Sequence, residues 1–396
     1  MNETHSRLIV TATLLATLLL AGCASAPERQ LSRALPSYAM LPNGNNPLHP
    51  DQRSPLADQL TNGGTETFLR SLERKHGRPL NGVSISGGGQ NGAFGAGFLV
   101  GWRESGRRPQ LDIVGGVSTG ALLATHAFLG TPADDAKLVE MYTQISKEDI
   151  YQDRGVLSIL SGADSLKDTT PLRALIAKYI TRETLSRVAA AYHDNRQIWI
   201  GTTNVDYDQT WVWNLSEVAR AGDLELYRKV LLASASFPIV FPPVEIEGHL
   251  FVDGAARSNL VVPGTAGKTR PPPPLYGSGN LYLIDNGKIE QAPEALRRAL
   301  GDVAATTVSV MMNHSMQTAL MRSYFGTQLL GYNFKMVGIA PSVEIGKDPL
   351  AFDPKQMQAA FDEGRARAKQ PEPWETIPPS VNDLPPWLIE AFKKKL

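Results

Sequence analysis

Short apolar runs alternate with helical patterns through the middle of the chain. Gly82 to Ser86 predicts a buried strand, and a glycine-rich turn joins it to a helical pattern from Ala93 to Arg103. Leu111 to Val117 predicts a second strand, and Ala121 to Leu129 a second helix. Further strands are expected at Gln197 to Thr203, Thr210 to Asn214, Leu250 to Val252 and Leu281 to Ile284. This alternation predicts an α/β fold of three layers, α/β/α, with a mostly parallel central sheet. In such sheets, sites gather at the carboxyl ends of the strands.

The N-terminus has the pattern of an export signal. An apolar run from Leu8 to Leu20 follows Arg7 and is too short to span a bilayer comfortably. It ends in Leu20-Ala-Gly-Cys23, which resembles the lipobox of bacterial lipoproteins. The resemblance implies cleavage before Cys23, lipid attachment to that cysteine and, with Ala24 next, sorting to the outer membrane. The alternative is a buried cysteine that follows an N-terminal helix.

Composition divides the rest of the chain. Residues 23–75 are expected to hold the lipidated cysteine and a flexible linker, because Ala24 to about Asn62 is rich in Pro, Asn and Ser. Asp353-Pro354 predicts the cap and first residue of a helix from Lys355 to Ala368. The sequence therefore predicts a signal peptide over 1–22, one domain over 76–370 and a proline-rich tail over 371–396.

Charge and cysteine content exclude several classes of protein. Lys plus Arg and Asp plus Glu both number 39, so the net charge is zero and no nucleic-acid partner is expected. Cys23 is the only cysteine, which excludes an intrachain disulfide and a cysteine-rich zinc site. The histidines do not show the spacing of a zinc hydrolase, and no metal or other cofactor is expected.

Gly116-Val-Ser118-Thr-Gly120 fits the Gly-x-Ser-x-Gly pattern between a predicted strand and a predicted helix. In that setting the pattern is typical of a nucleophile elbow, which lifts the serine hydroxyl clear of the backbone. Gly116 and Gly120 leave room for the sharp turn. An ordinary glycine-rich turn between strand and helix is the alternative.

A second glycine-rich turn covers Gly87, Gly88 and Gly89 and continues to Gly92. It offers backbone amides near a helix N-terminus, which suits either a nucleotide phosphate or the oxyanion of acyl transfer. The loop lacks the Lys-Ser/Thr of a phosphate loop, and a serine elbow follows about thirty residues later. The pattern therefore favours an oxyanion hole.

Asp253, followed by Gly254 and Ala255, ends another apolar run and could supply the base that a serine nucleophile needs. The order of triple-glycine loop, serine elbow, Ala233-Ser-Ala-Ser-Phe-Pro-Ile-Val-Phe-Pro-Pro243 and Asp253-Gly-Ala resembles the patatin-like phospholipase family over about residues 80 to 265. The resemblance implies a dyad of Ser118 and Asp253 that hydrolyses lipid acyl esters without a metal. Asn259 and Pro263 also resemble family positions. Asn91 departs from the pattern, because the family often has Arg or Lys there.

Other arrangements remain open. Ser118, Asp253 and His314 could formally make a triad, although His314 lies in a predicted helix, and His249 precedes Asp253. The same machinery would also serve a general esterase or a thioesterase. The rival from another class is a membrane-tethered binding module that only keeps the fold. We expect a phospholipase A or lysophospholipase that acts on membrane lipid and is anchored through Cys23 to the bacterial cell envelope.

Overall fold

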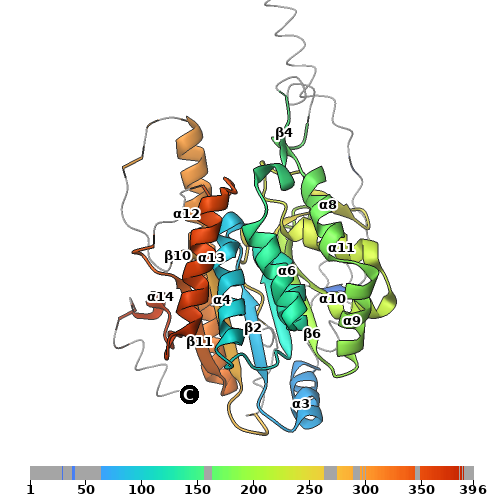
Figure 1. Ribbon diagram of the computed structural model, residues 1–396, viewed down its shortest axis with the longest axis vertical. Helices are drawn as coiled ribbons and strands as arrows, with labels where there is room; N and C mark the ends of the chain where they lie inside the picture. The colour runs from blue at the N-terminus through green and yellow to red at the C-terminus, as the bar shows by residue number, and fades with distance from the viewer. Residues whose placement is uncertain are drawn as a thin grey trace, which may run out of the picture.

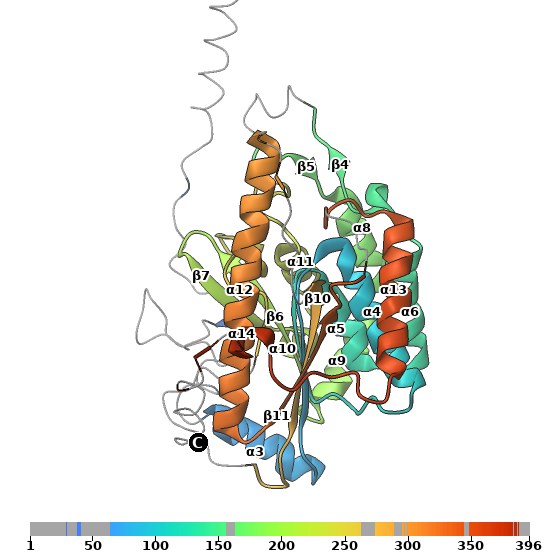
Figure 2. The same cartoon turned by 90° about the vertical axis from the view of Figure 1, so that its left-hand side faces the viewer.

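The computed structural model describes residues 64–155, 163–262, 274–288, 300–343 and 348–382, with residue 29, residues 38–40 and a few single positions beside them. The predicted signal peptide, Cys23 and Pro263 lie outside the described residues. Figures 1 and 2 show a central sheet with helices on both faces. The prediction of an α/β fold with a flanked, mostly parallel sheet is confirmed.

Nine described strands form the sheet. Its path runs β1 (Ala39–Met40), β7 (Gln209–Asn214), β6 (Gln197–Asn204), β3 (Ile113–Val117), β2 (Asn81–Ile85), β10 (Asn280–Lys288) and β11 (Asn333–Ile339). The strands from β6 to β11 pair in parallel. β9 (His249–Asp253) pairs antiparallel with β6 and with β8 (Val244–Ile246). Every strand named in the sequence analysis is present, and β1, β8 and β11 are additional strands of this sheet.

The helices make the two outer layers. Figure 2 shows α12 (Leu300–Leu330) on one face and, on the other, α4 (Gly92–Glu104), α5 (Thr119–Leu129), α6 (Pro132–Thr143) and α13 (Pro354–Lys369). Beside them lie α8 (Thr170–Tyr179), α9 (Arg182–Tyr192), α10 (Leu215–Ala221) and α11 (Leu224–Ser234). The predicted cap of α13 is confirmed, because the Asp353 carboxylate accepts hydrogen bonds from the amides of Lys355 and Gln356.

Glycines let α4 and α13 pack backbone to backbone. A Cβ atom added at Gly97 or Gly101 of α4 would lie 1.9 or 2.3 Å from a carbonyl oxygen of α13. One added at Gly364 of α13 would lie 2.1 Å from the Phe94 carbonyl oxygen. α13 therefore lies tightly against the helix that follows the predicted oxyanion loop.

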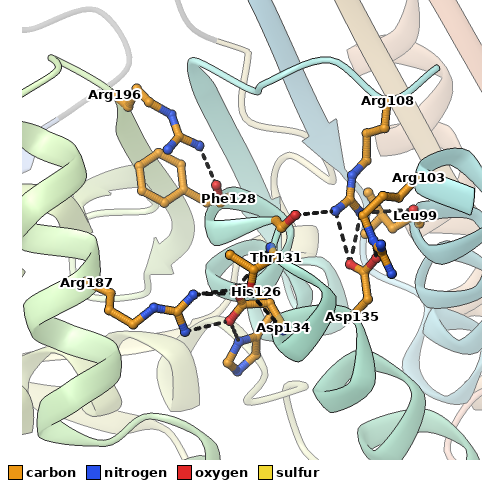
Figure 3. A network of polar contacts seen from close by, with 11 residues as sticks. Leu99, Arg103, Arg108, His126, Phe128, Thr131, Asp134, Asp135, Arg187 and Arg196 are labelled. Carbon is orange, nitrogen blue, oxygen red and sulfur yellow. Dashed lines mark hydrogen bonds and ion pairs between the residues drawn. The ribbon is translucent and has the colours of Figure 1, made fainter. Parts of the chain in front are cut away.

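Ion pairs with buried carboxylates join the last turn of α5, the first turn of α6 and the middle of α9 (Figure 3). The Asp134 carboxylate lies 3.1 Å from Nδ1 of His126 and accepts two hydrogen bonds from the Arg187 guanidinium. Next to it, the Asp135 carboxylate pairs with Arg103 and Arg108. We interpret the buried charges of Asp134 and Asp135 as part of the fold rather than of a site, because each carboxylate has a cationic partner.

The structure differs from the predicted boundaries at both ends of the domain. α3 (Gly64–His76) occupies the last part of the predicted linker. Within that linker, Ala39 is buried and pairs with Trp213 of β7, and Arg29 forms an ion pair with Asp206. The sequence predicted a linker here because this segment has few apolar residues. Contacts that involve only one or two residues leave no pattern in the composition.

The predicted tail is also partly folded. Trp374 packs against the rings of Phe98, Trp102 and Tyr282, and Glu375 exchanges backbone hydrogen bonds with Met336 of β11. The short helix α14 (Pro379–Asn382) follows. The domain therefore extends past the predicted boundary at residue 370. Among the described residues, no helix has the length and apolar character needed to span a membrane.

Candidate active site

The register of the sheet brings Ser118 and Asp253 together. Along one edge of β6, Val117 of β3 pairs with Gly201, and Asp253 of β9 pairs with the next residue, Thr202. Because β3 runs parallel to β6 and β9 runs antiparallel to it, the carboxyl ends of the two strands meet head to head. The residue that follows Val117 is Ser118, so the two predicted chemical groups lie at this junction.

Ser118 has the strained backbone of a nucleophile elbow. Its φ is 55° and its ψ is −125°, a region that non-glycine residues rarely occupy. A Cβ atom at Gly116 would lie 2.5 Å from the Gly120 carbonyl oxygen, and one at Gly120 would lie 2.1 Å from that of Ile85. Side chains at either position would therefore prevent the turn, as the sequence pattern predicted.

Ser234 and Ser236 tie both halves of the junction to the end of α11. The Ser118 amide donates a hydrogen bond of 2.9 Å to Ser234 Oγ, which in turn donates one of 2.7 Å to the Gly201 carbonyl. The Asp253 amide donates a hydrogen bond of 2.8 Å to the Ser236 carbonyl. Both serines belong to the motif quoted above, yet the sequence alone did not indicate these contacts.

The Asp253 carboxyl group is buried beside the serine. Its Oδ1 accepts a hydrogen bond of 2.8 Å from the Ala255 amide. Within the described part of the chain, its buried Oδ2 accepts no hydrogen bond of ordinary geometry. Burial raises the pKa of Asp253 to about 7, and the Ser118 hydroxyl and the Ala255 amide oppose this rise. A carboxylate with a pKa near neutrality is suited to accept and return a proton.

The four glycines of the predicted oxyanion loop have different roles. The Gly87 amide donates a hydrogen bond of 2.8 Å to Oδ1 of Asn259, and the Gly92 amide bonds within the short η1 turn (Gly89–Asn91). Because both amides are already bonded, the expected donor role fits neither of them. Among the described residues, the amides of Gly88 and Gly89 make no protein hydrogen bond, and both glycines are half-exposed. Of the four loop amides, these two could receive an oxyanion.

Gly87 instead allows a close approach. A Cβ atom there would lie 2.9 Å from Ser118 Cβ and 2.8 Å from Asn259 Oδ1. At Gly88, one would lie 2.6 Å from the Asn286 carbonyl oxygen. The loop is therefore held against the serine on one side and against the end of β10 on the other.

The end of β10 braces the glycine loop. Asn286 donates through Nδ2 to the Ser86 carbonyl at 2.7 Å and accepts from the Gly95 amide at 3.0 Å. The Ser86 hydroxyl lies 3.1 Å from Asp285 Oδ1. Burial raises the pKa of Asp285 to about 6. The sequence analysis missed both residues because nothing near them in the sequence indicates that β10 lies beside β2.

The histidines take no part in the junction. His314 lies exposed on α12, and His249 is buried at the start of β9 beside Asn204 and the aromatic ring of Trp211. His126 does pair with an acid, Asp134, but it lies two turns along α5 from Ser118. In the described part of the chain, no group of His, Cys, Asp and Glu side chains could hold a metal ion. The geometry thus offers a serine and an aspartate at the strand ends.

The middle of the chain is similar to a known protein family. Residues 83–265 match the family model described as patatin-like phospholipase. The solved structures that resemble the chain include VipD from Legionella pneumophila, with 14% identity and a TM-score of 0.35, and human GIVD cytosolic phospholipase A2 in complex with methyl gamma-linolenyl fluorophosphonate, with 9% identity and a TM-score of 0.27.

The coverage of these matches is partial. The match with VipD covers 74% of this chain and 66% of VipD, and the match with the human enzyme covers 83% and 63%. The chain thus spans less than two thirds of the length of either protein. A search of curated proteins found no match. The matched range contains both Ser118 and Asp253, so the part of the chain that carries both groups is similar to a patatin-like phospholipase domain.

Proposed function

We propose that the protein is a serine acyl hydrolase of phospholipase A or lysophospholipase type, with Ser118 as nucleophile and Asp253 as its base. The observation that carries this proposal is the head-to-head meeting of β3 and β9, which joins a strained serine to a buried carboxyl group. The match to the patatin-like phospholipase family supports a lipid ester as substrate.

In the first half of the reaction, the Asp253 carboxylate takes the proton of the Ser118 hydroxyl while Oγ attacks the ester carbonyl carbon. The amides of Gly88 and Gly89 stabilise the oxyanion that forms, and one such donor contributes about 3 to 4 kcal/mol to lowering the barrier. The carbonyl re-forms as the alcohol leaves with the proton from Asp253. An acyl-serine remains.

In the second half, Asp253 takes a proton from water, and the resulting hydroxide attacks the acyl-serine carbonyl. The same two amides hold the second oxyanion. Collapse of this intermediate returns the proton to Ser118 Oγ and releases a fatty acid. A base with a pKa near 7 supports both halves, because it exchanges protons readily at neutral pH.

Product analysis tests the substrate class. The chain from Ala24 onward, which keeps every described residue, is incubated with a diacyl phospholipid, a lysophospholipid, an acyl thioester and a soluble short-chain ester. We expect fatty acid release from the phospholipid or the lysophospholipid to exceed release from the thioester, and Ser118→Ala to abolish all four reactions. Preference for the thioester would instead favour a thioesterase. Turnover of the short-chain ester alone would favour a general esterase.

The rival function is a binding module that keeps the fold without catalysis. The strained φ of Ser118 argues against it, because a backbone strain of about 1 to 3 kcal/mol is usually maintained where it has a use. Failure of the folded wild type to hydrolyse any of the four esters would favour the binding module.

We also propose that the protein is a lipoprotein of the bacterial cell envelope, anchored in the outer membrane through Cys23 and acting on membrane lipid. The Leu20-Ala-Gly-Cys23 sequence supports this proposal. A labelled fatty acid fed to producing cells should enter the wild type and not Cys23→Ser. Equal labelling of both would contradict the anchor.

A further inference from the structure

The helix α12, which has no Asp, Glu, Lys or Arg between Asp302 and Arg322, extends past the edge of the sheet that carries the proposed active site. Met316, Ala319 and Leu320 of α12 pack on the sheet, and Met312 packs against a core cluster that includes Val117 and Ala255. Met312 is therefore level with the junction of Ser118 and Asp253. The helix continues from Met312 back to Leu300, which at about 1.5 Å per residue carries it roughly 18 Å beyond that level.

Three apolar side chains on this projecting part are exposed. Val303, Val310 and Met311 are 43%, 60% and 65% exposed. Thr306 and Thr307 are exposed beside them, and between Asp302 and Arg322 the sequence has no Asp, Glu, Lys or Arg. An exposed helix in water ordinarily carries charges on its outer face, so this composition indicates a less polar contact.

A second apolar point lies at the same edge. Ile239 is 70% exposed and has a φ of 71°, a conformation that a β-branched residue rarely adopts. Its segment begins just after Ser236, whose carbonyl binds the Asp253 amide, and its carbonyl accepts a hydrogen bond from the amide of Leu166, which is itself exposed. Figures 1 and 2 show the end of α12 and the β4–β5 pair (Gln152–Asp153 and Lys167–Asp168) projecting at the same end of the molecule.

The N-terminal attachment points to the same edge. Arg29 binds Asp206 and the Gly248 carbonyl, which lie in the turns beyond the carboxyl end of β6. Cys23 is six residues earlier, so it lies within about 21 Å of Arg29 even if the chain between them is fully extended. A lipid attached to Cys23 would therefore hold this edge close to a membrane.

We propose that the projecting half of α12, with Val303, Val310 and Met311, together with Ile239, docks on a phospholipid surface. Docking brings the proposed active site onto the bilayer, so that an acyl ester reaches Ser118 without first crossing water. The surface is short and contains many threonines and serines, which suits shallow insertion at the interface. This proposal rests on the proposed function, because the proposed active site and anchor define which edge of the sheet faces the membrane.

The test compares two ends of one helix. Val310→Asp/Met311→Asp alters the docking end, and Leu329→Asp alters an exposed apolar residue, 46% exposed, at the opposite end of α12. The chain from Ala24 onward is used, so that the anchor does not hold the protein on the membrane. Vesicles of phosphatidylethanolamine and phosphatidylglycerol are the probe. Vesicle co-flotation, hydrolysis of vesicle lipid and hydrolysis of a soluble short-chain ester are measured.

We expect the double variant to lose about tenfold or more of its vesicle binding and vesicle hydrolysis and to keep its rate on the soluble ester. Leu329→Asp should match the wild type in all three measurements. Unchanged vesicle binding in the double variant would overturn docking, and equal losses on vesicles and soluble ester would assign α12 a supporting role in the site instead.

Two further results separate the proposals. If the wild type binds vesicles and the double variant does not, but neither hydrolyses any ester, docking stands and the proposed function fails. If the wild type is a dimer in solution, the double variant is a monomer and both bind vesicles equally, the surface is a contact between copies of this chain and docking on lipid is overturned.

Discussion

At the scale of single residues, the proposed chemistry depends on the burial of Asp253. A carboxyl group in water would be a weak base at neutral pH, whereas burial raises the pKa of Asp253 to about 7. Ala255 and Ser236 fix its position through the backbone, so the proton-accepting oxygen stays beside Ser118. The same burial has a cost in stability.

The first prediction concerns pH. Because the base must be deprotonated, kcat/KM for a soluble ester should rise about tenfold per pH unit below 7 and level off above it. A rate that is flat from pH 5 to 8 in a folded protein would contradict Asp253 as base.

The stability of Asp253→Asn provides a second readout of the same group. The folded pKa of about 7 lies above the ordinary value of 3.8, so the folded protein binds more protons and loses stability as pH rises from 3.8 through 7. An amide has no such penalty. Urea unfolding should show Asp253→Asn gaining stability over the wild type as pH rises through this range, by a few kcal/mol at most. If the difference in free energy of unfolding between Asp253→Asn and the wild type is the same at pH 4 and pH 8, the carboxyl group is not buried.

Asn259 is a positioning residue whose loss should reduce turnover. Asn259→Ala leaves the buried Gly87 amide without its partner, at a cost of roughly 1 to 3 kcal/mol, and frees the loop beside Ser118. We predict that kcat for the soluble ester falls about a hundredfold while KM changes little. Asn280→Ala removes a similar side-chain hydrogen bond, to Asn81 at the opposite end of the sheet, and serves as control. Loss of stability with a normal kcat would make Asn259 merely structural.

At the scale of elements, the contact between α4 and α13 supports the glycine loop from behind. Before α13 begins, Pro349 accepts a hydrogen bond from the Gln90 amide, and the Gln90 side chain bonds with Gln356 and the Asp353 amide. The position of α13 therefore determines where η1 lies. This position depends on glycines that allow the two backbones to touch.

Gly364→Ala tests this dependence. Alanine favours a helix over glycine by about 1 kcal/mol, but its Cβ would lie 2.1 Å from a backbone oxygen of α4, which overpacking can make about 1 to 3 kcal/mol unfavourable. The backbone clash should prevail, and both the thermal midpoint and esterase activity should fall. Gly155→Ala, with nothing within 4 Å of the new atom, is the control. A variant as stable as the wild type would show that the helices can separate freely.

The local sequence pattern predicted the positions of the strands better than it predicted which strands lie side by side. Apolar runs located β2, β3, β6, β7, β9 and β10, because buried strands require apolar side chains. The sequence could not predict that the ends of β3 and β9 meet. Their meeting depends on pairing between residues far apart in the sequence, 117 with 201 and 202 with 253. The bracing by Asn286 and Ser234 was missed for the same reason.

At the scale of the whole molecule, the ends were harder to predict than the middle. Ala39 and Trp374 join the fold through a few contacts inside segments whose composition is that of a linker or a tail. Such contacts depend on surfaces formed by distant residues, Trp213 of β7 in one case and the rings around Tyr282 in the other. The signal and lipidation of Cys23 stay predictions.

The proposed membrane-facing features lie at one end of the molecule. The proposed active site, the projecting half of α12 and the attachment of Arg29 all lie at the carboxyl end of the sheet. The ion pairs of Figure 3 lie toward the other end of α5, where they connect it to α6 and α9. Substrate would thus enter from the side nearest the proposed anchor.

Labelling with a fluorophosphonate probe tests the Ser118–Asp253 dyad, because the probe reacts with a serine hydroxyl that a base activates. The chain from Ala24 onward is labelled as wild type, Ser118→Ala, Asp253→Asn and His314→Ala, and the modified peptide is identified by mass spectrometry. We predict an adduct on Ser118 in the wild type and in His314→Ala, and none in the other two. A folded wild type that does not label, or an Asp253→Asn variant that labels as fast as the wild type, would contradict the Ser118–Asp253 dyad.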